Sequence, residues 1–194
     1  MNITALSTIE LTLIIALAVI VVAGIAAWLF LRKRRRTEKL RTRFGGAEYA
    51  RAVEEAGSRR PAEAKLEDRI ERVEEFPIRP LAPGDRARFV DSWQRVQARF
   101  VDSPGGAVTD ADQLLGDVMS TRGYPVSDFE QRAADISVNH PLVLENYRAG
   151  HGIAVRQTQG QASTEDLRQA MIHYRTLFEE LVGESEVARA KSAA

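Results

Sequence analysis

Three histidines, His140, His151 and His173, are the side chains of this sequence best suited to acid–base chemistry or metal binding. A metal site would join two of them with a carboxylate such as Asp135 or Glu145. Zinc motifs place their ligands at short fixed spacings, and neither His-Glu-x-x-His nor His-x-His occurs here. The three histidines also belong to different predicted helices. With no cysteine in the chain, thiolate sites and disulfides are excluded, and we expect no metal site and no cofactor.

Two serines could serve as nucleophiles if a histidine activated them, but each is better explained as a helix cap. Ser127 stands three residues before Glu130, which is the spacing of a capping box, and Ser163 precedes the last long helical pattern. The G-x-S-x-G motif of serine hydrolases is absent from the sequence. Gly105-Gly106 is not followed by the G-K-[ST] of a phosphate-binding loop. The sequence therefore favours a non-catalytic protein over an enzyme.

Residues 11–31 contain no charged side chain. At about 1.5 Å per residue, a helix of this length spans roughly 31 Å, the thickness of a bilayer's hydrocarbon core. A cleaved signal peptide would need positive residues ahead of a shorter apolar segment, and residues 1–10 contain no Lys or Arg. We therefore predict a transmembrane helix over residues 11–31, with residues 1–10 as an external tail.

A basic stem over residues 32–45 follows the predicted span. Residues 32–43 hold eight Lys or Arg and one Glu, whereas residues 44–194 hold nineteen basic and twenty-five acidic residues. Basic residues beside a span mark its cytoplasmic side, which predicts a single-pass protein of the bacterial inner membrane with an external N-terminus and a cytoplasmic domain. The side chains expected to contact lipid headgroups are Arg32, Lys33, Arg34, Arg35, Arg36 and Lys39.

The expected partners are the lipid bilayer and a protein of unknown identity. The acidic balance of residues 44–194 weighs against nucleic-acid binding, which usually requires a basic face. Gly24, with Ala23, Ala26 and Ala27, forms a smooth patch that could pack another helix. Self-association therefore stays open, although small residues are also ordinary members of a span.

The remaining chain predicts an all-α fold, because helical patterns follow one another and no run alternates apolar and polar residues. We expect helices over residues 47–56, 58–76, 83–101 and 104–122, then two that start near Ser127 and near Asn139-His140-Pro141, and a last one from Ser163 to Gly183. The predicted organisation is a charged helical spacer over 46–76, a helical-bundle domain over 77–183 and a flexible tail over 184–194. Pro77 and Pro80 make the connector between the first two.

Apolar side chains at helical spacing predict the core of the bundle. Phe89, Trp93, Val96 and Phe100 fall within a 60° arc, and the other predicted stripes are Leu115 with Val118 and Met119, and Leu167 with Met171, Tyr174, Phe178 and Leu181. Gly150 and Gly152 interrupt a helical pattern where alanine would favour the helix, at a cost of about 1 kcal/mol each. Ala82 precedes Pro83 at a helix start without the side-chain oxygen of a good cap.

Four segments resemble an uncharacterised bacterial family of single-span membrane proteins, often labelled only "secreted" or "membrane" protein. They are RFVDSPGGAVTDADQLL, VMSTRGYP, FEQRAADISVNHP and ASTEDLRQAMIHYRTLFEEL. The resemblance covers about residues 43–182 and implies a helical C-terminal domain behind one span. Ala82, Gly150 and Gly152 depart from the family pattern. The resemblance brings no assigned activity with it.

Two functions are consistent with these patterns. The first is a membrane-anchored, non-catalytic helical domain that tethers or binds a protein at the inner membrane. The alternative is a sensory domain that binds a small apolar or metal ligand. A closed cavity lined by Trp93, Tyr147 and Tyr174 with converging polar groups would favour the alternative.

Overall fold

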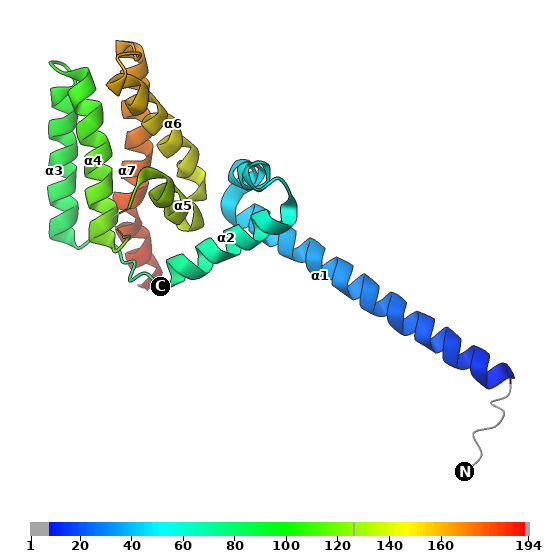
Figure 1. The fold of residues 1–194 in the computed structure, drawn as a ribbon. Coiled ribbons are helices and arrows are strands. Elements are labelled where there is room, and N and C mark those ends of the chain that lie inside the picture. Colours follow the sequence, from blue (N-terminus) through cyan, green and yellow to red (C-terminus); the bar gives the residue numbers. More distant parts are fainter. Residues whose placement is uncertain (1–7, 126, 193–194) are drawn as a thin grey trace. The chain divides into compact units, whose positions relative to one another are not determined.

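The computed structural model describes residues 8–125 and 127–192, with side chains described for residues 16–125 and 127–183 (Figure 1). Over these residues the chain is all-α, as predicted, and contains no strand. The helices are α1 (Thr8–Ala56), α2 (Arg59–Glu74), α3 (Pro83–Arg99), α4 (Pro104–Arg122), α5 (Phe129–Asn139), α6 (Pro141–Thr158) and α7 (Thr164–Ser192). The chain divides into two compact units, Met1–Arg43 and Phe44–Ala194.

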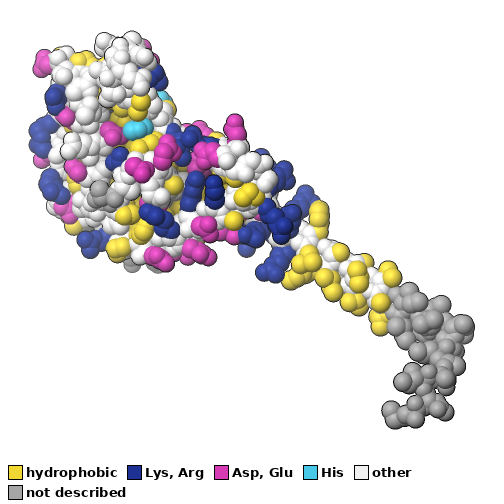
Figure 2. Space-filling model, viewed as in Figure 1, with side chains coloured by type: hydrophobic (Ala, Val, Ile, Leu, Met, Phe, Trp, Pro, Cys, Tyr) yellow, Lys and Arg dark blue, Asp and Glu magenta, His cyan; other side chains and the backbone are white. Residues whose placement is uncertain are grey.

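The first unit contains the apolar part of α1. Large apolar side chains from Leu17 to Leu31 are each at least 50% exposed, and basic side chains follow them directly (Figure 2). Within the described residues this is the one helix long and apolar enough to cross a membrane, judged by length and composition. None of its apolar window is buried, unlike the core helix of a soluble protein. Residues 11–31 are helical as predicted, whereas residues 1–7 of the predicted external tail lie outside the described residues.

The second unit begins with the last turns of α1. At Gly45 the backbone leaves helical geometry, with φ 75° and ψ 159°, and the helix then resumes to Ala56. Gly57, with φ 70°, ends it as predicted. Next, α2 buries Leu66 and Val73 and packs against α5. Residues 46–76, predicted as a spacer, thus lie in the same compact unit as residues 77–183.

Helices α3, α4, α6 and α7 form the main bundle, in which α7 packs against α6 and α4, and α3 packs against α4 (Figure 1). The predicted apolar stripes line its core. Trp93 stacks on Phe178 with ring centroids 4.8 Å apart, and Tyr174 is fully buried. Pro83 and Pro104 occupy the first turns of their helices, as predicted from their fixed φ. Gly123 ends α4 with φ 102°.

Two predicted helix boundaries are wrong. The cap of α5 is Asp128 rather than Ser127, because the Asp128 carboxylate accepts the Gln131 N–H at 2.9 Å. Helix α7 continues through Gly183 to Ser192. Gly183 does not adopt the positive φ of a helix-ending glycine. The Val-Ala-Arg-Ala-Lys that follows shortly after it contains mostly good helix formers, which outweigh the cost of one glycine. The flexibility predicted for residues 184–194 stays a prediction, and residues 193–194 lie outside the described part.

Candidate functional site

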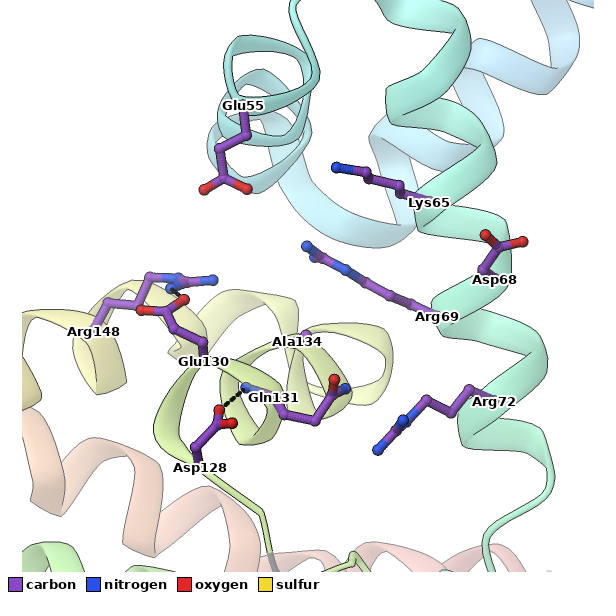
Figure 3. A pocket seen from close by; sticks show the side chains of 10 residues that line it. All are labelled: Glu55, Lys65, Asp68, Arg69, Arg72, Asp128, Glu130, Gln131, Ala134 and Arg148. Carbon is purple, nitrogen blue, oxygen red and sulfur yellow. Dashed lines mark hydrogen bonds and ion pairs between the residues drawn. The ribbon is translucent and has the colours of Figure 1, made fainter.

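A groove of about 490 Å³ lies in the second unit between the end of α1, α2, α5 and α6 (Figure 3). Its lining residues are Glu55, Lys65, Asp68, Arg69, Arg72, Asp128, Glu130, Gln131, Ala134 and Arg148. Ala134 is the single apolar member of this set. The groove therefore suits a polar or charged ligand rather than an apolar one.

Three cations line the groove from α2. Lys65, Arg69 and Arg72 have the spacing i, i+4, i+7, which places them within a 60° arc of the helix. Figure 3 shows their head groups on the same side of α2, directed into the groove. Each cation directly precedes one member of the apolar stripe Leu66, Ile70 and Val73. Packing that stripe against the domain therefore brings the cations to the edge of the packed face.

Two buried carboxylates hold the arginines of the groove. Glu48, 6% exposed, accepts from Arg69 Nη1 at 2.8 Å and from Arg148 Nη2 at 3.5 Å. Asp135, 1% exposed, accepts from Gln131 Nε2 at 2.7 Å and lies 3.2 Å from Arg72 Nε. Burial raises the pKa of Asp135 above its usual range, although Gln131 and Arg72 act in the opposite direction. These pairs fix the guanidinium groups in place before any ligand arrives.

The carboxylates that line the groove come mainly from α5 and the end of α1. Asp128 is engaged as the cap of α5. Glu130 Oε2 lies 3.0 Å from Arg148 Nη1, and Glu55 pairs with Arg51 at 2.8 Å. Glu130 is 70% exposed, so water competes for its pair with Arg148.

A second polar cluster lies in the main bundle around Asp112. Its carboxylate accepts from the Tyr174 hydroxyl at 3.0 Å and lies 3.7 Å from His151 Nδ1 and 3.8 Å from Arg132 Nη2. Burial alone would raise the pKa of Asp112, but His151, Tyr174 and Arg132 outweigh it and lower that pKa. The cluster joins α4, α5, α6 and α7 through one carboxylate. The Tyr174 hydrogen bond and the nearby His151 and Arg132 stabilise the negative charge of Asp112 within the bundle. This arrangement indicates a structural role for the cluster.

Aromatic rings surround the Asp112 cluster. The His151 ring stacks on Phe129 with centroids 3.5 Å apart, and Tyr147 lies between Phe129 and Tyr174. The Tyr147 hydroxyl is buried and has no hydrogen-bond partner among the described residues. Burial raises the pKa of the Tyr147 hydroxyl, which keeps it protonated. Of the three side chains whose closed cavity would favour the alternative function, Trp93 stacks on Phe178, and Tyr147 packs against Tyr174 with ring centroids 6.4 Å apart.

The remaining predicted site residues lie apart from one another. His140 occupies the N-cap position of α6 but makes no side-chain cap bond, and its Nδ1 lies 3.3 Å from Glu180. His173 Nδ1 lies 2.8 Å from Asn146 Oδ1. Ser163 caps α7 as predicted, because its hydroxyl accepts the Asp166 N–H at 3.1 Å. In the part of the chain that the structure describes, no group of three or more His, Asp or Glu side chains could hold a metal ion.

The predicted lipid contacts lie in the first unit. All six side chains, Arg32, Lys33, Arg34, Arg35, Arg36 and Lys39, are exposed on α1. Arg32 lies over the Trp28 ring at 5.3 Å, a cation–π contact at the end of the apolar segment. Their contact with lipid stays a prediction.

No family model, curated protein or solved structure matches this chain. The resemblance to a bacterial membrane-protein family stays a prediction, and function has to be argued from geometry. Sequence reasoning missed the groove, since Glu48, Arg69 and Arg148 meet only through the fold. The sequence signal that could have indicated the groove is the cation that directly precedes each apolar position of the α2 stripe.

Proposed function

We propose that this protein is anchored by one helix in the bacterial inner membrane and that its cytoplasmic helical domain binds a protein partner without catalysis. The observation that carries this proposal is the groove, whose lining residues are polar or charged except for Ala134 and whose arginines are held by buried Glu48 and Asp135. Polar side chains fixed in advance lose little conformational freedom on binding, which favours recognition of another polar chain.

The membrane part of the proposal rests on α1. Its large apolar side chains are exposed, which is unfavourable in water, and a bilayer would cover them. The six basic side chains from Arg32 to Lys39 would then lie at the headgroups of the cytoplasmic leaflet. The lining of the groove supports a protein partner over a small apolar ligand, because Ala134 is its single apolar residue.

Two experiments test this function. A reporter that is active only in the cytoplasm, fused after Ala194, should be active, and a reporter active only outside should be silent. Moving the five cations of residues 32–36 ahead of Glu10 should weaken or invert that preference. A periplasm-active fusion of the natural chain would contradict the assigned orientation.

The second experiment is crosslinking in cells followed by mass spectrometry. A photo-reactive residue at Gln131, in the groove, should capture a defined protein. The matched control is a photo-reactive residue at Arg168, an exposed position on α7 outside the groove. Equal capture at both positions, or capture at neither, would contradict a role for the groove in partner binding.

A further inference from the structure

We propose that the groove binds an acidic peptide segment, whose carboxylates meet Lys65, Arg69 and Arg72 along α2. This inference rests on the proposed function, since it names the chemistry of the partner. It follows from which charges of the groove a ligand can reach, how far apart they lie and what else lines the groove.

The positive charges are reachable, whereas the carboxylates that hold two of them are not. The Arg69 and Arg72 side chains are 19% and 44% exposed, but Glu48 and Asp135 are 6% and 1% exposed. A guanidinium has five N–H donors, and the two ion pairs described above use one nitrogen of each arginine. Lys65 has no ion-pair partner among the described residues. A ligand on this side of α2 therefore meets unused donors.

The spacing of the cations favours a chain over a single anion. Lys65 and Arg72 are seven residues apart, which is about 10.5 Å along a helix. One phosphate group is too small to contact both ends of that row. An extended segment of about three to four residues covers the distance, at about 3.3 Å per residue. Ala134 is the single apolar residue type in the lining, so charged and polar side chains would make the main contacts, which favours a peptide over the acyl chain of a lipid.

The carboxylates of the groove oppose such a ligand to different extents. Asp128 and Glu55 are already engaged, by the α5 cap and by Arg51. Glu130 is exposed and pairs with Arg148, so an incoming carboxylate would compete with it for the same guanidinium. Asp68 lines the groove without an ion pair in the described residues. Neutralising Glu130 or Asp68 should therefore tighten binding.

The test uses the full chain in phosphatidylcholine nanodiscs with a fluorescent hexaglutamate peptide and fluorescence anisotropy. Because the basic stem would also attract hexaglutamate, Arg34, Arg35, Arg36 and Lys39 are changed to Gln throughout. In that background Lys65→Gln should weaken binding about threefold and Lys65→Glu about tenfold, because an exposed pair is lost and then replaced by repulsion. Lys65 contacts no acidic partner in the described structure, so neither change should disturb the fold.

Matched controls locate the binding in the groove. Arg168→Gln removes an exposed cation on α7 and should leave the affinity unchanged. Glu130→Gln should strengthen binding, and a hexaglutamine peptide should not bind. Circular dichroism of each variant confirms that helix content is retained. Equal affinities of the Lys65→Glu and Arg168→Gln variants, or no binding of hexaglutamate at all, would overturn the proposal.

Two further arms separate the sources of negative charge. Displacement of hexaglutamate by millimolar inorganic phosphate, or a Lys65-dependent association with phosphatidylglycerol vesicles that exceeds peptide binding, would assign the groove to phosphate chemistry instead. Crosslinked partner capture at Gln131 that persists in the Lys65→Glu chain would leave the proposed function standing and overturn only the acidic-segment inference.

Discussion

The main bundle and the groove region of the second unit are held together by different forces. In the bundle, Trp93, Leu115 and Tyr174 are nearly or fully excluded from water, and the contacts between helices are mostly apolar. In the groove region, α2 buries a narrower apolar stripe, and ion pairs of Glu48 and Asp135 complete its attachment.

This difference indicates that the two regions have different roles. Apolar burial stabilises in proportion to area, at about 25 cal/mol per Å². Partly buried ion pairs gain little net free energy, because the attraction is offset by the loss of hydration. We infer that the bundle supplies most of the stability of the unit, whereas the groove region supplies a set of oriented charges. Its helix α2 should therefore open more readily than α7.

Trp93→Ala tests the apolar side of this comparison and should have the largest effect. The ring is 6% exposed and stacks on Phe178, so its loss leaves a cavity in the bundle. We expect the free energy of unfolding to fall by about 3–5 kcal/mol, measured by urea denaturation of residues 44–194. A loss below about 1 kcal/mol would show that the bundle core does not depend on this ring.

Two glycines of α6 form a matched pair within the bundle. A Cβ at Gly150 would lie 2.8 Å from the Tyr174 ring, whereas a Cβ at Gly152 meets no described atom within 4 Å. Gly150→Ala should therefore destabilise the unit by about 1–3 kcal/mol through overpacking. Gly152→Ala should stabilise it by up to about 1 kcal/mol through helix propensity. Equal midpoints of urea denaturation for the two variants would contradict the close packing of α6 on α7.

Glu48→Gln tests the charged side of the comparison. The change leaves Arg69 and Arg148 without their shared carboxylate, and we expect a loss of about 1–2 kcal/mol. Hydrogen exchange should rise over α2 while α7 keeps its protection, because neither partner of Glu48 lies on α7. A rise spread evenly over both helices would show that the two regions unfold as one.

Asp112 should make the stability of the bundle depend on pH, because its carboxylate is a charged group within the bundle. Its pKa is lowered in the folded state, so its contribution to stability is present above the pKa of the unfolded chain, about 3.9, and is lost as the pH falls through the folded value. Asp112→Asn should cost about 1 kcal/mol at pH 7 and less at pH 3. Urea denaturation at both pH values measures this. A difference that grows on acidification would contradict the assigned direction.

Ala82→Ser should have the smallest effect, at the entry to the bundle. Ala82 is the N-cap of α3 and supplies no side-chain acceptor to the first turn. A serine hydroxyl there should raise the free energy of unfolding by about 0.5–1 kcal/mol. Ala87→Ser, the same change at an exposed position inside α3, is the matched control and should not raise the free energy of unfolding, because serine is a poorer helix former than alanine. An unchanged denaturation midpoint for Ala82→Ser would contradict the capping argument.

Much of the bundle could be predicted from the sequence because its signals are local. Apolar positions repeat every three to four residues, and Pro83, Pro104 and Gly123 mark helix ends by their own backbone preferences. One predicted boundary failed because two adjacent residues could each cap the helix, and Asp128 rather than Ser127 caps α5. The end predicted at Gly183 failed because Gly183 does not adopt the positive φ common at helix ends, and α7 continues to Ser192.

The groove could not be predicted, because its contacts join residues far apart in the chain. Glu48 meets Arg69 and Arg148, which lie 21 and 100 residues away. In a chain rich in Arg and Glu, many such pairings are compatible with the same helices. The close packing of Gly150 could not be predicted for the same reason, since it depends on Tyr174 of another helix.

Tyr174 has a consequence for how this sequence can change over generations. Its ring fills the space left by Gly150, and its hydroxyl donates to Asp112. A smaller side chain would leave a void, phenylalanine would remove a donor from the part-buried Asp112 carboxylate, and tryptophan would not fit against α6. Neutral drift at position 174 therefore requires compensating changes at positions 112 and 150, so these three positions should evolve as a linked set, while position 152 remains free to vary alone.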